Sequence, residues 1–337
     1  MPPVLVFTQG DPAGIGPEIL AKVLLAPDGG QDYAPLLIAE KAALDPLRPV
    51  LPGLAWEKLY PVETGAGREA IEKAARQGKV AWLDPTGSKR ILEFGKSGKE
   101  DAIGALRALD AGIEIVSTGI GDALVTAPLG KKEIADHLLP TFRGHTDYLA
   151  EKAALGPYGR DYLMAFLSPD LRVALLTVHQ PLRKALDAVT PESISEALRC
   201  LDRHTGKNKK IAVAGFNPHA GENGLLGEED RDLVAPGVQM ARDEGIDVHG
   251  PFSADSLFAR AREGEFDWVL ALTHDQGLIP VKTAAFGQAT NWTLGLPYIR
   301  TSVDHGTAHD IAGKDLAKVD SLRSVIETTL RLVAERK

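Results

Sequence analysis

The sequence predicts an α/β protein with a mostly parallel sheet, because short apolar runs alternate with helical patterns along most of the chain. Runs without polar alternation, which are typical of strands buried on both faces, occur at 4–8, 122–126, 171–178, 210–216 and 266–272. A chain of 337 residues can bury a sizeable core, which indicates two domains or one large bilobed unit.

Composition excludes several classes of protein. A hydrophobic fraction of 44% with 25% charged residues is ordinary for a soluble globular chain, and a net charge of -8 argues against a nucleic-acid-binding surface. No run approaches the roughly 20 apolar residues of a membrane span, and the N-terminus lacks the features of a signal peptide. The single cysteine, Cys200, excludes an internal disulfide framework and fits the reducing cytoplasm. It lies in the helical pattern at 193–204, where we expect a buried structural thiol.

The first apolar run, at 4–8, leads into a glycine-rich segment at 10–18 and then a helical pattern to 25. Pro17 suits the first turn of a helix, and Glu18 suits its positive end. Backbone NH groups of such a loop can face a phosphate, whereas a tight strand–helix turn would need the same glycines, and both interpretations stay open. The segment is not GxGxxG, so the usual dinucleotide fingerprint is absent.

The next elements follow in order. Apolar runs and loops alternate from 36 to 83, and 97–115 is a long helical pattern before the strand at 122–126. A Gly-His-Thr-Asp sequence at 144–147 then opens a helix that continues to 154. His145 and Thr146 stand at that helix start, where a hydroxyl and free NH groups can bind an anion or Thr146 can serve only as a cap.

The second half repeats this alternation. Helices are predicted after Pro191, between about 230 and 244, and at 321–337, and strands are predicted at 171–178, 210–216 and 266–272. The segment 250–255 reads as a loop with one candidate carboxylate, Asp255.

Three histidines follow three of the predicted strands. His179, His219 and His274 each come at, or within a few residues of, the carboxyl end of a buried run. These ends lie along one edge of a parallel sheet, so the imidazoles could converge on a divalent ion such as Zn²⁺. A hydrogen-bonded structural histidine is the alternative at each position.

The stretch 274–314 is unusually rich in polar and glycine residues. Lys282, Asn291 and Arg300 occur at spacings too irregular for one helix face, so we expect each to be delivered by its own loop or strand end. The sequence His305-Gly306-Thr307-Ala308 lies near its end, with glycine allowing close backbone approach to a ligand.

Taken together, these motifs resemble the family of 4-hydroxythreonine-4-phosphate dehydrogenase, PdxA, over nearly the whole chain. The matching segments are GDPAGIGPE at 10–18, VTAPLGK at 125–131, GHTD at 144–147, NPHAGE at 217–222, HDQG at 274–277 and TLGLPYIRTSVDHGTA at 293–308. The resemblance implies an isocitrate/isopropylmalate dehydrogenase-like two-lobed fold and a homodimer with its active site at the subunit interface. One lobe would comprise 1–130 and 285–337, and 131–284 would form the middle lobe.

The resemblance also implies roles for individual residues. His179, His219 and His274 would be metal ligands, for Zn, Mg or Co. The implied substrate-binding residues are His145, Thr146, Asp255, Lys282, Asn291 and Arg300. The implied cofactor-binding residues are Gly14, Gly16, His305, Gly306, Thr307 and Ala308. The reaction would oxidise and decarboxylate 4-phosphooxy-L-threonine with NAD or NADP, giving 3-amino-2-oxopropyl phosphate in pyridoxal phosphate biosynthesis.

Some positions depart from the family pattern. Gly130 stands where many members have Asn or His, Asp147 stands where Glu is usual, and 288–290 replace a more glycine-rich run. These departures leave open 4-phospho-D-threonate or 4-phospho-D-erythronate as substrate. A phosphate-ligand binding protein without turnover, or a phosphotransacetylase-like acyltransferase, is an alternative of another class.

Overall fold

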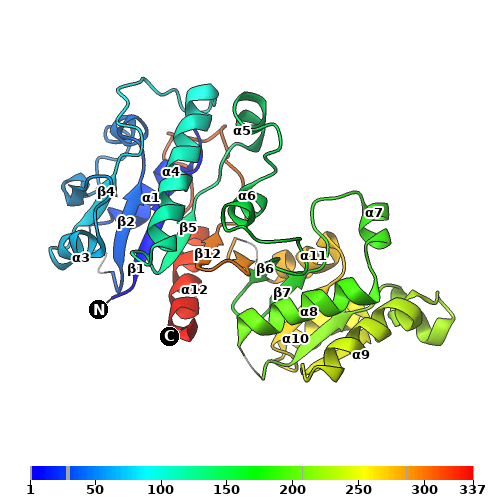
Figure 1. Ribbon diagram of the computed structural model, residues 1–337. Helices are drawn as coiled ribbons and strands as arrows, with labels where there is room; N and C mark the ends of the chain where they lie inside the picture. The colour runs from blue at the N-terminus through cyan, green and yellow to red at the C-terminus, as the bar shows by residue number, and fades with distance from the viewer. Residues whose placement is uncertain (1, 28–30, 207, 286, 337) are drawn as a thin grey trace. The chain divides into compact units, whose positions relative to one another are not determined.

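The computed structural model describes residues 2–27, 31–206, 208–285 and 287–336, and the chain divides into two compact units. Unit 1 comprises Met1–Leu149 and Pro297–Lys337, and unit 2 comprises Ala150–Leu296. Figure 1 shows the first strands (blue) and the C-terminal helix (red) within unit 1.

Unit 1 is built on parallel strands covered by helices. Its strands run in the order β3-β4-β2-β1-β5-β12, and every pairing among them is parallel. They are β1 (Val4–Thr8), β2 (Ala34–Ile38), β3 (Leu59–Pro61), β4 (Val80–Leu83), β5 (Ala123–Thr126) and β12 (Ile299–Ser302). The helices are α1 (Gly16–Leu24), α2 (Lys41–Leu44), α3 (Arg68–Arg76), α4 (Lys99–Ser117), α5 (Lys131–His137) and α12 (Asp320–Arg336). Helix α6 (His145–Lys152) begins in this unit.

Unit 2 mixes parallel and antiparallel pairs in the order β11-β6-β7-β10-β8-β9. The pairs β11–β6 and β6–β7 are antiparallel, and the rest are parallel. The strands are β6 (Leu163–Leu167), β7 (Arg172–Leu175), β8 (Ile211–Ala214), β9 (Val248–Phe252), β10 (Trp268–Ala271) and β11 (Thr290–Leu294). The helices are α7 (Leu182–Asp187), α8 (Pro191–Thr205), α9 (Ala235–Asp243), α10 (Ala254–Arg262) and α11 (His274–Ala284), with shorter turns η3 (Pro218–Gly224) and η4 (Asp230–Val234). The predicted α/β class with mostly parallel strands is confirmed.

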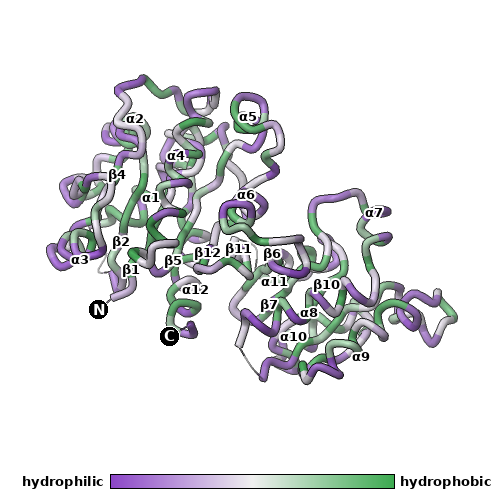
Figure 2. Tube along the Cα trace, in the orientation of Figure 1, coloured by the Kyte–Doolittle hydropathy of each residue, from purple (hydrophilic) through white to green (hydrophobic). Residues whose placement is uncertain are grey.

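The strands form where the sequence supplies continuous apolar runs. Every residue of β1, β2, β5, β8 and β10 is buried, which only a strand covered on both faces achieves. Figure 2 shows the hydrophobic colour along labelled strands such as β2 and β5, and the hydrophilic colour on exposed helices such as α3. Cys200 is fully buried in α8, and burial raises the pKa of its thiol to about 12, as expected of a structural cysteine. Across the described ranges, no helix combines the length and apolar character needed to cross a membrane.

Two local expectations were wrong. Lys282 lies inside α11 and not on a loop or strand end, because the helix that begins at His274 continues through Pro280, a residue that argues against a helix in sequence. The segment 250–255 is not one loop, since β9 extends to Phe252 and Asp255 lies in the first turn of α10.

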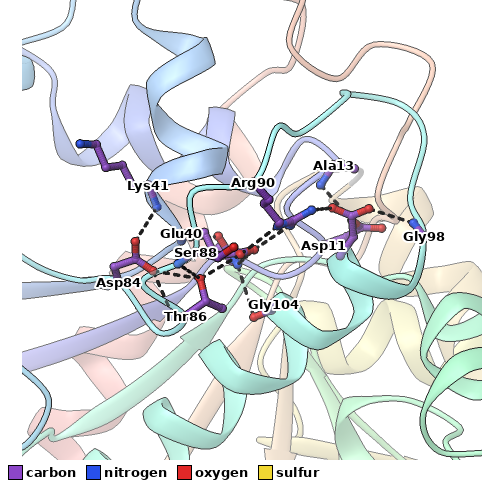
Figure 3. A network of polar contacts seen from close by, with 12 residues as sticks. Asp11, Ala13, Glu40, Lys41, Asp84, Thr86, Ser88, Arg90, Gly98 and Gly104 are labelled. Carbon is purple, nitrogen blue, oxygen red and sulfur yellow. Dashed lines mark hydrogen bonds and ion pairs between the residues drawn. The ribbon is translucent and has the colours of Figure 1, made fainter.

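A buried ionic network supports the start of the glycine-rich segment (Figure 3). The guanidinium of Arg90 donates to both carboxylate oxygens of Glu40, at 3.1 and 2.9 Å, and to Asp101 at 2.7 Å. Gln9, directly before Gly10, donates to Glu40 through its amide at 3.2 Å and accepts the Glu40 backbone NH at 2.8 Å. The network therefore ties the end of β1 to the end of β2 and to α4.

Candidate active site

Arg300 is a buried, positively charged residue of unit 1. It lies in β12, and its Nη2 donates to Thr126 Oγ1 of the neighbouring β5 at 2.7 Å. The side chain is 1% exposed, and burial lowers the pKa of Arg300 to about 9. The guanidinium is still charged at neutral pH, so an anionic ligand beside it would offset its desolvation.

His145 begins α6 in the same unit and is held neutral. Burial, assisted by the positive charges of Arg300 and Lys131, holds the pKa of His145 well below its ordinary value. Its Nε2 is inaccessible to solvent and has no hydrogen-bond partner among the described residues. A bound ligand can supply the hydrogen-bond partner that this buried ring nitrogen lacks. Thr146 is buried beside it.

The glycine-rich segment packs directly on the loop at 305–308. The backbone NH of Ile15 donates to the Thr307 carbonyl at 2.9 Å, and a Cβ at Gly14 would lie 2.9 Å from that carbonyl. A Cβ at Gly16 would come within 2.1 Å of the Gln9 carbonyl. Both glycines are therefore needed for close backbone packing, which supports the turn interpretation while bringing the two candidate cofactor segments together.

Glu18 fixes the remainder of the same C-terminal loop. Its buried carboxylate accepts the backbone NH groups of Gly313 and Ala317 at 3.0 and 3.1 Å, and the Lys22 ammonium at 2.8 Å. The sequence interpretation placed Glu18 at the positive end of α1, where it lies, but not in this contact.

Two further residues of this unit were missed. His309 Nε2 lies 2.9 Å from Asp11 Oδ2, and the other Asp11 oxygen accepts the Ala13 backbone NH at 2.9 Å. Asp11 and His309 are 298 positions apart, so only the fold brings them together. The only indication in the sequence was that Asp11 belongs to the glycine-rich segment at 10–18 and His309 to the polar stretch at 274–314.

In unit 2, the strands that precede the three histidines are adjacent and parallel. β10 lies between β7 and β8, so the carboxyl ends of all three share one edge, as the sequence predicted. The rings of His179 and His274 have centroids 5.4 Å apart, a separation at which two imidazoles can ligate one ion. His274 begins α11, and its Nδ1 lies 2.8 Å from Asp275 Oδ1.

The backbone around His219 is unusual. It starts a run of left-handed residues, from φ 52° at His219 to φ 58° at Asn223, that includes four non-glycine positions. Such backbone is costly and is concentrated at functional sites in proteins. A hydrogen bond from Ser253 is the main cause that holds the pKa of Asp255 low, and Asp255 is near enough to His219 for the two predicted site residues to interact electrostatically. Over the described ranges, no three His, Cys, Asp or Glu side chains of the single chain group tightly enough to hold a metal ion.

Lys282 and Asn291 complete the predicted set in unit 2. An open depression of about 520 Å³ is lined by His274, Asp275, Leu278, Ile279, Lys282 and Thr283. Lys282 therefore shares one face of α11 with a candidate metal ligand. Asn291 lies in β11, and its Oδ1 is buried without a hydrogen-bond partner within the described part of the chain.

Comparison with known proteins gives consistent matches. The family model described as pyridoxal phosphate biosynthetic protein PdxA matches residues 33–329. A 4-hydroxythreonine-4-phosphate dehydrogenase of Neisseria meningitidis is 39% identical, over 98% of each chain, and a D-threonate 4-phosphate dehydrogenase of Salmonella typhimurium is 38% identical, over 97% of this chain and 98% of the relative. The crystal structure of 4-hydroxythreonine-4-phosphate dehydrogenase from Klebsiella pneumoniae superposes with a TM-score of 0.84 at 32% identity, over 99% of this chain and all of that one.

Proposed function

The chain belongs to the family of the pyridoxal phosphate biosynthetic protein PdxA, and on that premise we propose that it oxidises and decarboxylates 4-phosphooxy-L-threonine, with NAD or NADP as hydride acceptor. The product would be 3-amino-2-oxopropyl phosphate, an intermediate of pyridoxal phosphate biosynthesis. Relatives named as 4-hydroxythreonine-4-phosphate dehydrogenases and aligned over nearly the whole chain support the assignment.

The observation that carries the proposal is the pairing of a buried cation with a buried neutral imidazole in unit 1. Arg300 can bind a phosphate or carboxylate through two parallel hydrogen bonds, and His145 Nε2 can bond the same ligand. Thr146 would add its hydroxyl. We propose substrate roles for Lys282, Asn291 and Asp255 of unit 2 as well.

We propose that a divalent ion binds at the histidines of unit 2, where the ring centroids of His179 and His274 lie 5.4 Å apart. His179 and His274 would hold it together with His219, and when bound it would act as a Lewis acid toward the hydroxyl that is oxidised. Zn, Mg and Co are all candidates. For the cofactor, the contact between Gly14 and Thr307 supports a binding surface formed by Gly14, Gly16, His305, Gly306, Thr307 and Ala308.

We also propose that the protein is a homodimer. Exposed apolar side chains lie close in sequence to each candidate metal ligand: Leu182 at 63%, Leu225 at 77% and Ile279 at 65% exposure. A second copy could cover them and supply ligands that one chain does not bring together. Light scattering should give the mass of two chains, and a stable, fully active monomer would contradict the proposal.

The reaction is tested by mixing protein, a divalent ion and NAD⁺ or NADP⁺ with 4-phosphooxy-L-threonine and following absorbance of the reduced cofactor. We expect turnover, and we expect Arg300→Ala to lower kcat/KM by about one to two orders of magnitude, since a hydrogen bond to a charged group contributes roughly 1.5–3 kcal/mol. The loss should be much smaller for an unphosphorylated analogue if Arg300 binds the phosphate. Equal losses would assign Arg300 to the carboxylate, and absence of turnover would leave a phosphate-binding protein.

A second substrate is supported by one relative. It is 38% identical to this chain and is named as a D-threonate 4-phosphate dehydrogenase. Comparing kcat/KM for 4-phosphooxy-L-threonine, 4-phospho-D-threonate and 4-phospho-D-erythronate decides between them.

A further inference from the structure

The carboxylate of Glu133 fills the space beside Gly130. A Cβ built on Gly130 would lie 2.4 Å from Glu133 Oε2 and 2.9 Å from Asp11 Oδ2. Any side chain at 130 would therefore require both of these groups to move. In this chain the Glu133 carboxylate therefore occupies the space that a side chain at 130 would take.

The carboxylates of Asp11 and Glu133 differ in burial and in hydrogen bonding. Asp11 is 1% exposed, and both its oxygens are used, by the Ala13 backbone NH and by His309. Glu133 is half-buried in the first turn of α5 and makes no hydrogen bond or ion pair with any residue that the structure describes. Glu133 is thus the carboxylate that remains available to a ligand.

Positive charges lie near the residues that follow this segment. Lys131, next to Gly130, directs its side chain to Gly144, where a Cβ would lie 3.2 Å from Lys131 Cε. Together with Arg300 it depresses the pKa of His145, so these three residues surround one region. The buried Nε2 of His145, without a partner in the described ranges, independently indicates a ligand there. This part of unit 1 therefore contains cations that can bind an anionic group and, at Gly130, the Glu133 carboxylate that can bind a cationic one.

We propose that Glu133 is a specificity-determining residue that binds the ammonium group at C2 of the substrate. The inference rests on the proposed function and deepens it. 4-Phosphooxy-L-threonine carries an ammonium at C2 as well as a phosphate and a carboxylate, whereas the phosphorylated threonate and erythronate carry a hydroxyl there. A charged carboxylate stabilises an ammonium more strongly than a hydroxyl, so Glu133 favours the amino acid.

The test compares Glu133→Gln with wild-type protein on 4-phosphooxy-L-threonine and 4-phospho-D-threonate. Glutamine keeps the shape and removes the charge. We expect kcat/KM for the amino acid to fall about tenfold and kcat/KM for the hydroxy acid to stay within about twofold, with KM for the nicotinamide cofactor and the melting temperature unchanged. Asp136→Asn, which removes the charge of an exposed carboxylate on the same helix, is the matched control. It should leave kcat/KM unchanged for both the amino acid and the hydroxy acid.

Equal losses on both acids, an unchanged rate with the amino acid, or an effect confined to KM for the cofactor would each overturn the assignment of Glu133. Wild-type protein that oxidises neither acid would overturn the proposed function and this inference with it. Wild-type turnover combined with an unaltered preference in Glu133→Gln would overturn the inference alone.

Discussion

Replacing His274 with alanine is expected to remove most of the bound divalent ion and to lower turnover at least about 100-fold, while the fold persists. Loss of a supporting contact to a metal ligand already costs about 10–100-fold, and loss of one of three ligands should cost more. The His274 side chain is about one-third exposed, so alanine leaves no buried cavity. Metal content of the purified protein and the rate of cofactor reduction measure the effect.

The same losses are expected for His179→Ala and His219→Ala. His249 provides the matched control, because its exposed ring lies 2.7 Å from the exposed Asp247 carboxylate and takes no part in the proposed site. His249→Ala should keep full metal occupancy and rate. A His219→Ala protein with full occupancy and a near-normal rate would show that the three histidines do not act as one ligand set.

Most strands with continuous apolar runs were predictable, because a strand that is buried on both faces needs apolar residues at successive positions. This signal located β1, β5, β7, β8 and β10, and with them the shared edge at which the three histidines stand. It did not locate β6, although Leu163–Leu167 is itself a continuous apolar run and fully buried, and it gave no indication of the antiparallel pairs that β6 makes with β7 and β11. It also failed at Lys282, where Pro280 obscured a helix that tertiary packing stabilises.

Site residues were predictable where they belong to a recognisable sequence segment. They were not predictable where their position depends on a contact with a residue elsewhere in the chain. His145 and Arg300 belong to such segments, but the burial that gives them unusual pKa values depends on the packed sheet. Glu133 gains its position only through the missing side chain of Gly130, and His309 only through Asp11. Such contacts leave no periodic pattern in the sequence.

Arg90→Ala is expected to lower the free energy of unfolding by about 3–5 kcal/mol, because it leaves two carboxylates buried without their cation. The side chains of Glu40 and Asp101 are 1% and 10% exposed, and that of Arg90 is 14% exposed. Burial disfavours the charged guanidinium, but hydrogen bonds to both carboxylates outweigh it and raise the pKa of Arg90 above its ordinary value. Arg199→Ala is the matched control, since Arg199 makes the same two-pronged contact with Glu244 at the surface and should cost about 1 kcal/mol or less.

The pH dependence of this loss distinguishes an unpaired charge from lost packing. Without Arg90, two buried carboxylates are left without a cation, and burial without a cation favours the protonated form of a carboxyl group. A group whose folded pKa is raised loses stability as pH rises through that pKa, so the deficit of the variant should be larger at pH 8 than at pH 5. Denaturant unfolding of both variants and the wild type at the two pH values measures it. A deficit independent of pH would mean that Arg90 acts through packing alone, and a deficit no larger than that of Arg199→Ala would mean that the network does not hold the end of β1.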